Sequence, residues 1–175
     1  MESLVVTVVG PDRPGLVSLL SDCGRAHGAS WEESRMASLA GQFAGIVHFV
    51  VPAEQKAALT AALEALQTLG LRAVVVPGAL ESARTEDRLL KLDLVGQDRP
   101  GIIRDISRAM SDLGVSIREL TTELSSAAMS GEHLFSAKAL LSVPGTVRSA
   151  ELRRVLEALA NELMVDLVLD EGQGT

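Results

Sequence analysis

The chain contains very little cysteine: Cys23 is the only one in 175 residues. One cysteine cannot form an intramolecular disulfide, which is compatible with a reducing cytoplasm. It also cannot complete a zinc site, because His27, His48 and His133 lack the spacing of metal ligands. We therefore predict a protein without a metal or another cofactor, and we expect it in the cytoplasm.

Aromatic and basic residues are also scarce. Aromatic side chains make up 2% of the chain, none of them tyrosine, and Lys and Arg (16) are outnumbered by Asp and Glu (23), for a formal net charge of −7. Proteins that grip nucleic acid need clustered Lys and Arg for the phosphates, and RNA-recognition motifs also stack bases on sheet aromatics. The composition therefore argues against direct binding of nucleic acid.

Long apolar runs are missing as well. No stretch approaches the roughly 18 residues that span a bilayer. Residues 1–10 do not combine a basic segment with an apolar one, as a secretion signal would. Because 47% of the residues are hydrophobic and 22% are charged, as in ordinary globular proteins, we expect no association with membranes.

What the sequence does contain is an internal repeat. Gly-Pro-Asp-Arg-Pro-Gly at 10–15 returns as Gly-Gln-Asp-Arg-Pro-Gly at 96–101, with five of six residues unchanged and an offset of 86 positions. Each copy follows an apolar extended run and precedes a segment with apolar residues at helical spacing. The repeat indicates one fold encoded twice, with the strand-to-helix turn as the first place to look for function.

The same series of elements is predicted around each hexapeptide. Composition and periodicity predict a strand, a helix, two strands, a second helix and a last strand. Gly28 and Gly114 hold equivalent positions and are predicted to end the first helices. The predicted strands are 4–9, 30–39, 43–51 and 71–76 in the first copy, and 90–95, 115–124, 133–143 and 164–169 in the second.

The order βαββαβ, found twice, is the split βαβ arrangement of ferredoxin-like folds. We predict the α+β class with two tandem domains, each an antiparallel four-stranded sheet that carries both helices on one face. The stretch between the copies is polar and lacks periodicity, as expected of a linker. The predicted bounds are 1–77 and 88–172 for the domains, 78–87 for the linker and 173–175 for a C-terminal tail.

The hexapeptide has a structural and a functional interpretation. As a turn, its glycines permit unusual backbone angles, its aspartate caps the helix and its proline takes the first helical position. As a site, free N–H groups at the helix start attract an anion, while the aspartate attracts an ammonium group. A turn that offers both is suited to a zwitterion.

In this turn, in the βαββαβ order and in the length of each copy, the chain resembles the ACT-domain family of small-molecule regulatory modules, over nearly its whole length. Two such domains without a catalytic or DNA-binding segment are most similar to the glycine cleavage system transcriptional repressor group. The resemblance implies a non-enzymatic regulator of amino-acid or one-carbon metabolism that acts through a protein partner. It also implies that free amino acids bind at the first strand-to-helix loop, at interfaces between ACT domains.

Carried over by position, the resemblance implies one ligand site in each copy. It further implies that the two domains pack together, and the same reasoning allows a homodimer. Many sites of the family use an asparagine, whereas the only asparagine here is Asn161, in a late helix. The implied ligand-binding residues are Gly10, Asp12, Arg13, Gly15 and Leu16 in the first copy, and Gly96, Asp98, Arg99, Gly101 and Ile102 in the second.

Other interpretations stay open. A purely structural or oligomerisation module without a ligand has the same fold, and the missing asparagine favours it. An acylphosphatase-type enzyme needs an arginine in a phosphate-cradling loop and an asparagine that places water, whereas this loop carries an acid and no asparagine is near it. Cys23 lies four residues before His27 but on the apolar stripe of its helix, which predicts a buried structural cysteine. We predict no catalytic residue.

Overall fold

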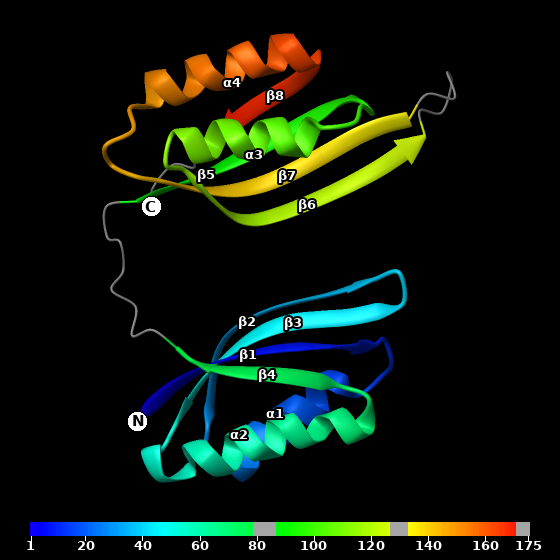
Figure 1. Ribbon diagram of the computed structural model, residues 1–175, viewed down its shortest axis with the longest axis vertical. Helices are drawn as coiled ribbons and strands as arrows, with labels where there is room; N and C mark the ends of the chain where they lie inside the picture. Colours follow the sequence, from blue (N-terminus) through cyan, green and yellow to red (C-terminus); the bar gives the residue numbers. More distant parts are fainter. Residues whose placement is uncertain (79–86, 127–132, 171–175) are drawn as a thin grey trace. The chain divides into compact units, whose positions relative to one another are not determined.

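The computed structural model describes residues 1–78, 87–126 and 133–170. The chain divides into two compact units, Met1–Ser82 (unit 1) and Ala83–Thr175 (unit 2). Each unit contains four strands and two main helices in the order βαββαβ (Figure 1), which confirms the predicted α+β, ferredoxin-like fold class. Residues 79–86 of the predicted linker and the predicted tail 173–175 lie outside the described residues.

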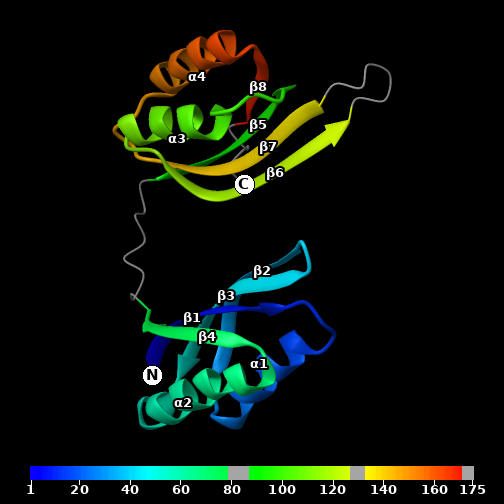
Figure 2. The same ribbon diagram turned by 45° about the vertical axis from the view of Figure 1, so that its right-hand side comes forward.

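Unit 1 is an antiparallel sheet in the order β2-β3-β1-β4 with two helices on one face (Figure 2). The central position of β1 places the end of that strand, and the loop that follows it, beside the start of β4. The elements are β1 (Glu2–Pro11), α1 (Leu16–Ala26), β2 (Ser30–Leu39), β3 (Gln42–Val51), the 3₁₀ helix η1 (Ala53–Gln55), α2 (Lys56–Ala65), the 3₁₀ helix η2 (Leu66–Leu69) and β4 (Arg72–Pro77).

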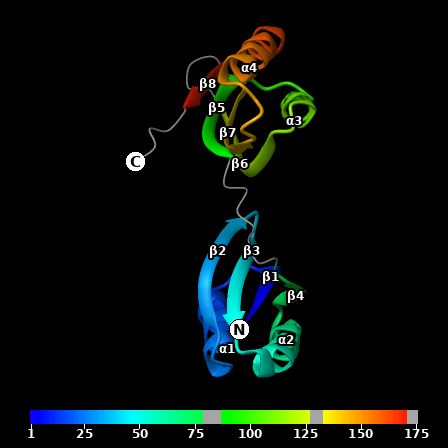
Figure 3. The same ribbon diagram turned by 90° about the vertical axis from the view of Figure 1, so that its left-hand side faces the viewer.

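Unit 2 repeats this arrangement, with the strand order β6-β7-β5-β8 and both helices again on one face (Figure 3). No described helix combines the length and apolar character that crossing a bilayer requires. The elements are β5 (Arg88–Gln97), α3 (Ile102–Asp112), β6 (Ser116–Ser126), β7 (His133–Val143), α4 (Ser149–Leu163) and β8 (Val165–Asp170).

Each unit has its own hydrophobic core between sheet and helices. Side chains alternate along the central strands, so every second residue of β1 and β5 faces the helices and is buried. Helix positions three or four apart complete each core, as their spacing predicts. The most buried side chains include Leu4, Val6, Leu20, Phe49, Leu59 and Leu63 in unit 1, and Leu94, Met110, Leu141, Leu152 and Leu156 in unit 2.

Glycine ends the first helix of each unit, as predicted. Gly28 and Gly114 have φ angles of 66° and 72°. In each case the next residue, Ala29 or Val115, donates its N–H back to the last helical turn, at 3.0 and 2.9 Å. This is the Schellman arrangement, in which a left-handed residue satisfies helix carbonyls that would otherwise lack donors.

A β-bulge follows the first helix in both units. The pairing register shifts between Trp31 and Glu33 in β2, and between Ile117 and Glu119 in β6. The bulge leaves Trp31 packed on the core, where its ring meets Phe49 edge-on with centroids 5.3 Å apart. Because the bulge occurs at equivalent positions of the repeat, it belongs to the fold rather than to one copy.

The sheet face opposite the helices, the outer face, differs between the units. In unit 1 Val9, Ile46, Val74 and Val76 are 43–51% exposed there, and the charged residues on this face are Glu33, Arg35 and Arg72. In unit 2 the corresponding face also has exposed apolar residues, Val95 and Val168, but it carries more charge. Its charged residues are Lys91, Asp93, Glu119, Glu123, Lys138, Asp166 and Asp170.

We predict that Met164→Gly stabilises unit 2. Met164 has a φ of 52°, and glycine stands at the equivalent position of unit 1, Gly70, with a φ of 83°. A left-handed conformation costs a residue with a Cβ roughly 1–2 kcal/mol. Glycine avoids this strain, but part of the gain is lost because glycine gives the unfolded chain more conformational entropy. In urea unfolding of the full chain, the free energy of unfolding of Met164→Gly should be about 0.5–1 kcal/mol higher than that of Met164→Ala. The alanine variant keeps the strain while removing the thioether, so equal stabilities would contradict the prediction.

Candidate ligand-binding loops

The repeated hexapeptide forms the same loop in both units. Residues 10–15 (the first loop) connect β1 to α1, and residues 96–101 (the second loop) connect β5 to α3. Each loop therefore brings its predicted site residues together by chain connectivity alone. The predicted packing of the two domains against each other stays a prediction.

Gly10 and Gly96 are required by close approach of the chain. A Cβ on Gly10 would collide with the backbone carbonyl oxygen of Gly70, just before β4. A Cβ on Gly96 would lie 2.5 Å from Cγ1 and 3.1 Å from Cα of Val165, at the start of β8. The first glycine of each loop thus lets the central strand pair tightly with the last strand of its unit.

Gly15 and Gly101 are required by backbone conformation instead. Their φ angles are 92° and 96°, in the left-handed region, and no atom outside the neighbouring residues lies within 4 Å of a Cβ built on Gly15. Each is the N-cap of its helix, and its carbonyl oxygen accepts the first helical hydrogen bond, at 2.9 Å from Leu19 N and Asp105 N respectively.

This geometry corrects two sequence predictions about the turn. Asp12 and Asp98 were predicted to cap the helices, but neither helix has a side-chain cap. Pro14 and Pro100 were predicted at the first helical position, yet both precede the N-cap glycine. The physical reason is that a left-handed residue must stand between the proline and the helix, so the helix begins later and its first N–H groups lack a side-chain acceptor.

The aspartates fix the loops through their backbone instead of their carboxylates. Asp12 N–H donates to the carbonyl of Gly41, in the β2–β3 turn, at 2.9 Å. Asp98 N–H donates to the carbonyl of His133, at the start of β7, at 3.0 Å. Both aspartate side chains are exposed, so both carboxylates face solvent beside a helix start.

The arginines reach away from the helix start. Arg13 Nη2 donates to the carbonyl oxygen of Leu69 at 2.7 Å, at the end of the second helical segment of unit 1. Arg99 Nη2 lies 3.9 Å from the sulfur of Met164, at the equivalent place in unit 2. Cations are favourable at helix C-termini, where carbonyl oxygens lack donors. Both arginines therefore already have a structural contact.

Leu16 and Ile102 lie beneath the loops. Each is only 3% exposed and belongs to the core of its unit. Their side chains anchor the first helical turn, which fixes where its N–H groups point. Their predicted contact with a ligand, like that of the other loop residues, stays a prediction.

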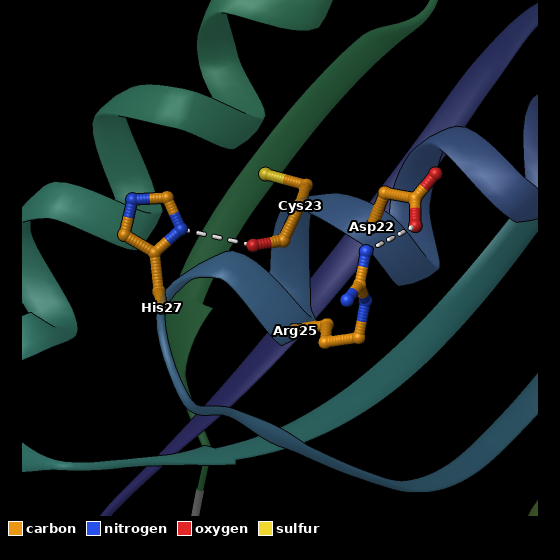
Figure 4. A network of polar contacts seen from close by, with 4 residues as sticks. All are labelled: Asp22, Cys23, Arg25 and His27. Carbon is orange, nitrogen blue, oxygen red and sulfur yellow. Dashed lines mark hydrogen bonds and ion pairs between the residues drawn. The ribbon is translucent and has the colours of Figure 1, made fainter.

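Cys23 and His27 do not form a nucleophile and base. Figure 4 shows the His27 ring directed at the backbone of the preceding turn, where Nδ1 donates to the carbonyl oxygen of Cys23 at 2.9 Å. Arg25 and Asp22 form an exposed ion pair beside them, at 3.3 Å. Cys23 packs against the core of unit 1, and burial raises the pKa of its thiol. A raised pKa leaves less of the reactive thiolate.

The other polar groups described in residues 1–78 offer no metal site. His48 Nε2 and Ser3 Oγ share a hydrogen bond of 2.8 Å on the outer face. Among the described residues, no three His, Cys, Asp or Glu side chains are grouped so as to hold a metal ion. His27 lies at the end of α1, and His48 and His133 lie on strands β3 and β7.

Sequence reasoning missed the contacts that brace the loops. The Arg13–Leu69 hydrogen bond joins residues 56 positions apart, and no local pattern reports such a pair. The close approach at Gly10 had one available signal, namely that Gly96 occupies the same position in the other copy. A glycine kept in both copies of a divergent repeat marks a backbone requirement.

We predict that the last glycine of each loop is replaceable only by a residue that tolerates positive φ. Gly15→Val should cost about 1–2 kcal/mol, because its Cβ is strained in the left-handed region. Gly15→Asn should cost clearly less, since asparagine adopts this region more readily. Urea unfolding of the full chain measures both values. Equal destabilisation by Val and Asn would show that conformation is not what Gly15 supplies.

We also predict that Cys23 is a slow thiol. At pH 8 the folded protein should react with a disulfide reagent such as DTNB more slowly than free cysteine does, because burial raises its pKa and limits access. Unfolding in urea should remove the difference. Cys23→Ser is the blank, and a reaction faster than that of free cysteine would contradict the prediction.

Two solved structures resemble the whole chain. An unknown protein from Galdieria sulphuraria is 30% identical, with 97% of this chain and 98% of that one covered and a TM-score of 0.82. A protein described as a candidate glycine cleavage system transcriptional repressor is 17% identical, with 97% and 96% covered and a TM-score of 0.73. At that identity the second likeness concerns the fold alone. No curated protein matches the chain.

The repeat itself matches a known family. The model of the ACT domain matches residues 2–76 and again residues 88–170. These two ranges contain every helix and strand described above except Pro77, the last residue of β4. Because the match covers both copies and most of the chain, this protein belongs to the ACT-domain family, with two ACT domains in tandem.

Proposed function

We propose that the chain is a non-enzymatic regulatory protein of the cytoplasm whose ACT domains bind a free amino acid at the first and second loops. The observation that carries the proposal is the same loop built twice. In each unit a left-handed glycine starts a helix without a side-chain cap, beside an exposed aspartate. The family membership supports a small-molecule role for that loop.

The loop chemistry suits the two ends of an amino acid. Uncapped N–H groups and the positive end of the helix dipole stabilise a carboxylate. The carboxylate of Asp12 or Asp98 can accept hydrogen bonds from the ammonium group of the same ligand. Arg13 and Arg99 act here as braces, because their guanidinium groups reach the far end of the second helix.

The contacts between each loop and the rest of its unit also allow ligand binding to affect a protein partner. Each loop is tied to a hairpin or strand through the aspartate N–H and to a second helix through the arginine. A ligand that binds the ordered loop better than a loosened one shifts the population toward the ordered form. A protein partner that contacts the hairpin or helix would then respond to the ligand, and the partner would set the effect on transcription or metabolism.

A second candidate is a structural ACT module without a ligand. The observation that favours it is that Gly10, Gly15 and Arg13 all have a structural reason for their presence, and so do their counterparts in unit 2. Under this alternative the exposed aspartates have no binding role.

Thermal unfolding with each of the twenty amino acids separates the two candidates. An amino acid present at 100 times its Kd adds about 2.7 kcal/mol to the free energy of unfolding, which raises Tm by several degrees. We expect at least one amino acid to do so. Asp12→Asn together with Asp98→Asn should abolish the shift, because the ammonium group loses its anionic partner at both loops.

Asp112→Asn is the matched control, since this exposed aspartate lies at the far end of α3 from the second loop. It should leave the ligand-induced shift unchanged. A protein that no amino acid stabilises is the structural module instead. A shift that survives in the double variant would place the ligand away from the loops.

A further inference from the structure

Unit 2 carries an open groove on its helical side, distinct from the loops. The groove lies between α3 and α4 and has a volume of about 390 Å³. Its floor is apolar, formed by Ala109 of α3 and by Val155, Ala158 and Leu159 of α4, with Arg154 and Glu162 at its rim. Ala158 is exposed and Val155 half-buried, so apolar surface is left uncovered along the seam of the two helices.

The charges on α4 are arranged symmetrically about Ala158. Arg154 precedes it by four residues and Glu162 follows it by four, so all three lie along one stripe of the helix. Both charged side chains are exposed. Within the described part of the chain, neither Arg154 nor Glu162 has an ion pair, so both charges are available to a partner.

This arrangement is complementary to itself. When two α4 helices lie antiparallel and cross at Ala158, Arg154 of each copy meets the partner's Glu162. The contact occurs twice because a two-fold interface is isologous. Alanine at the crossing lets the helices approach closely.

The other copy of the repeat serves as an internal control. The offset that brings Leu63 of unit 1 onto Leu156 of unit 2 places Ala61, Ala65 and Leu69 opposite Arg154, Ala158 and Glu162. Unit 1 therefore keeps the core leucine and the small central residue but has neither charge. The charged pair is therefore a feature of unit 2 and not a requirement of the fold.

We propose that the α3–α4 groove of unit 2 is the contact surface for a second copy of this chain, with α4 packed antiparallel on the partner's α4 across a two-fold axis at Ala158. Val155 and Leu159 of each copy are covered in this dimer, and the two Arg154–Glu162 pairs fix its register. The inference goes beyond amino-acid binding and does not depend on it.

Charge reversal tests the proposal on the full-length protein. Sedimentation over a range of concentrations should show a dimer for the wild type. Arg154→Glu and Glu162→Arg should each weaken dimerisation by about tenfold or more, since both symmetric pairs become repulsive. The decisive step is a mixture of the two variants, which should dimerise with each other because every facing pair is again of opposite sign.

Glu157→Arg is the matched control, with the same charge change at an exposed α4 position that lines the opposite side, toward β8. It should dimerise as the wild type does. Circular dichroism and thermal unfolding verify that all variants are folded. A wild type that stays monomeric, a dimer that both reversals leave intact, or a mixture that fails to associate would each overturn the proposal. A dimer that both reversals leave intact would show that another face forms the interface. A monomeric wild type would show that a second copy does not occupy the groove.

Discussion

Each unit depends on how the chain leaves its central strand and enters its first helix. The turn is made by one glycine, Gly15 or Gly101, whose φ angle is positive. A residue with a Cβ is strained in this conformation. That conformation sets the phase of the helix, so that Leu16 or Ile102 enters the core at once. It also leaves the first helical N–H groups without a side-chain acceptor, because glycine occupies the N-cap position and the aspartate lies three residues before it.

The order of elements and the class of the fold could be predicted from the sequence because their signals are local. Alternating or β-branched runs, helical spacing and helix-ending glycines such as Gly28 each act over a few residues. The repeat strengthened every one of these signals, since the same pattern appears twice. The bounds of the strands are accordingly close to those predicted.

The loop was harder to predict, because its geometry depends on partners far along the chain. The string Gly-x-Asp-Arg-Pro-Gly is equally compatible with aspartate as the helix cap, and only the backbone conformation shows that the left-handed Gly15 or Gly101 occupies that position. Arg13 illustrates the same limit. The family resemblance implies that it contacts a ligand, while its hydrogen-bond partner in the structure is the carbonyl of Leu69. Family resemblance directs attention to this loop, whereas the structural role of each residue in it depends on three-dimensional contacts.

The outer faces give the two units unequal responses to salt. The outer face of unit 2 carries more charged residues, and Coulomb interactions among them are largely screened over about 8 Å at physiological ionic strength. Molar sulfate or phosphate instead strengthens the tendency of apolar residues to leave water, both Val74 and Val76 in unit 1 and Val95 and Val168 in unit 2. Modest sodium chloride therefore acts more on unit 2 than on unit 1, whereas strongly excluded salts act on both units.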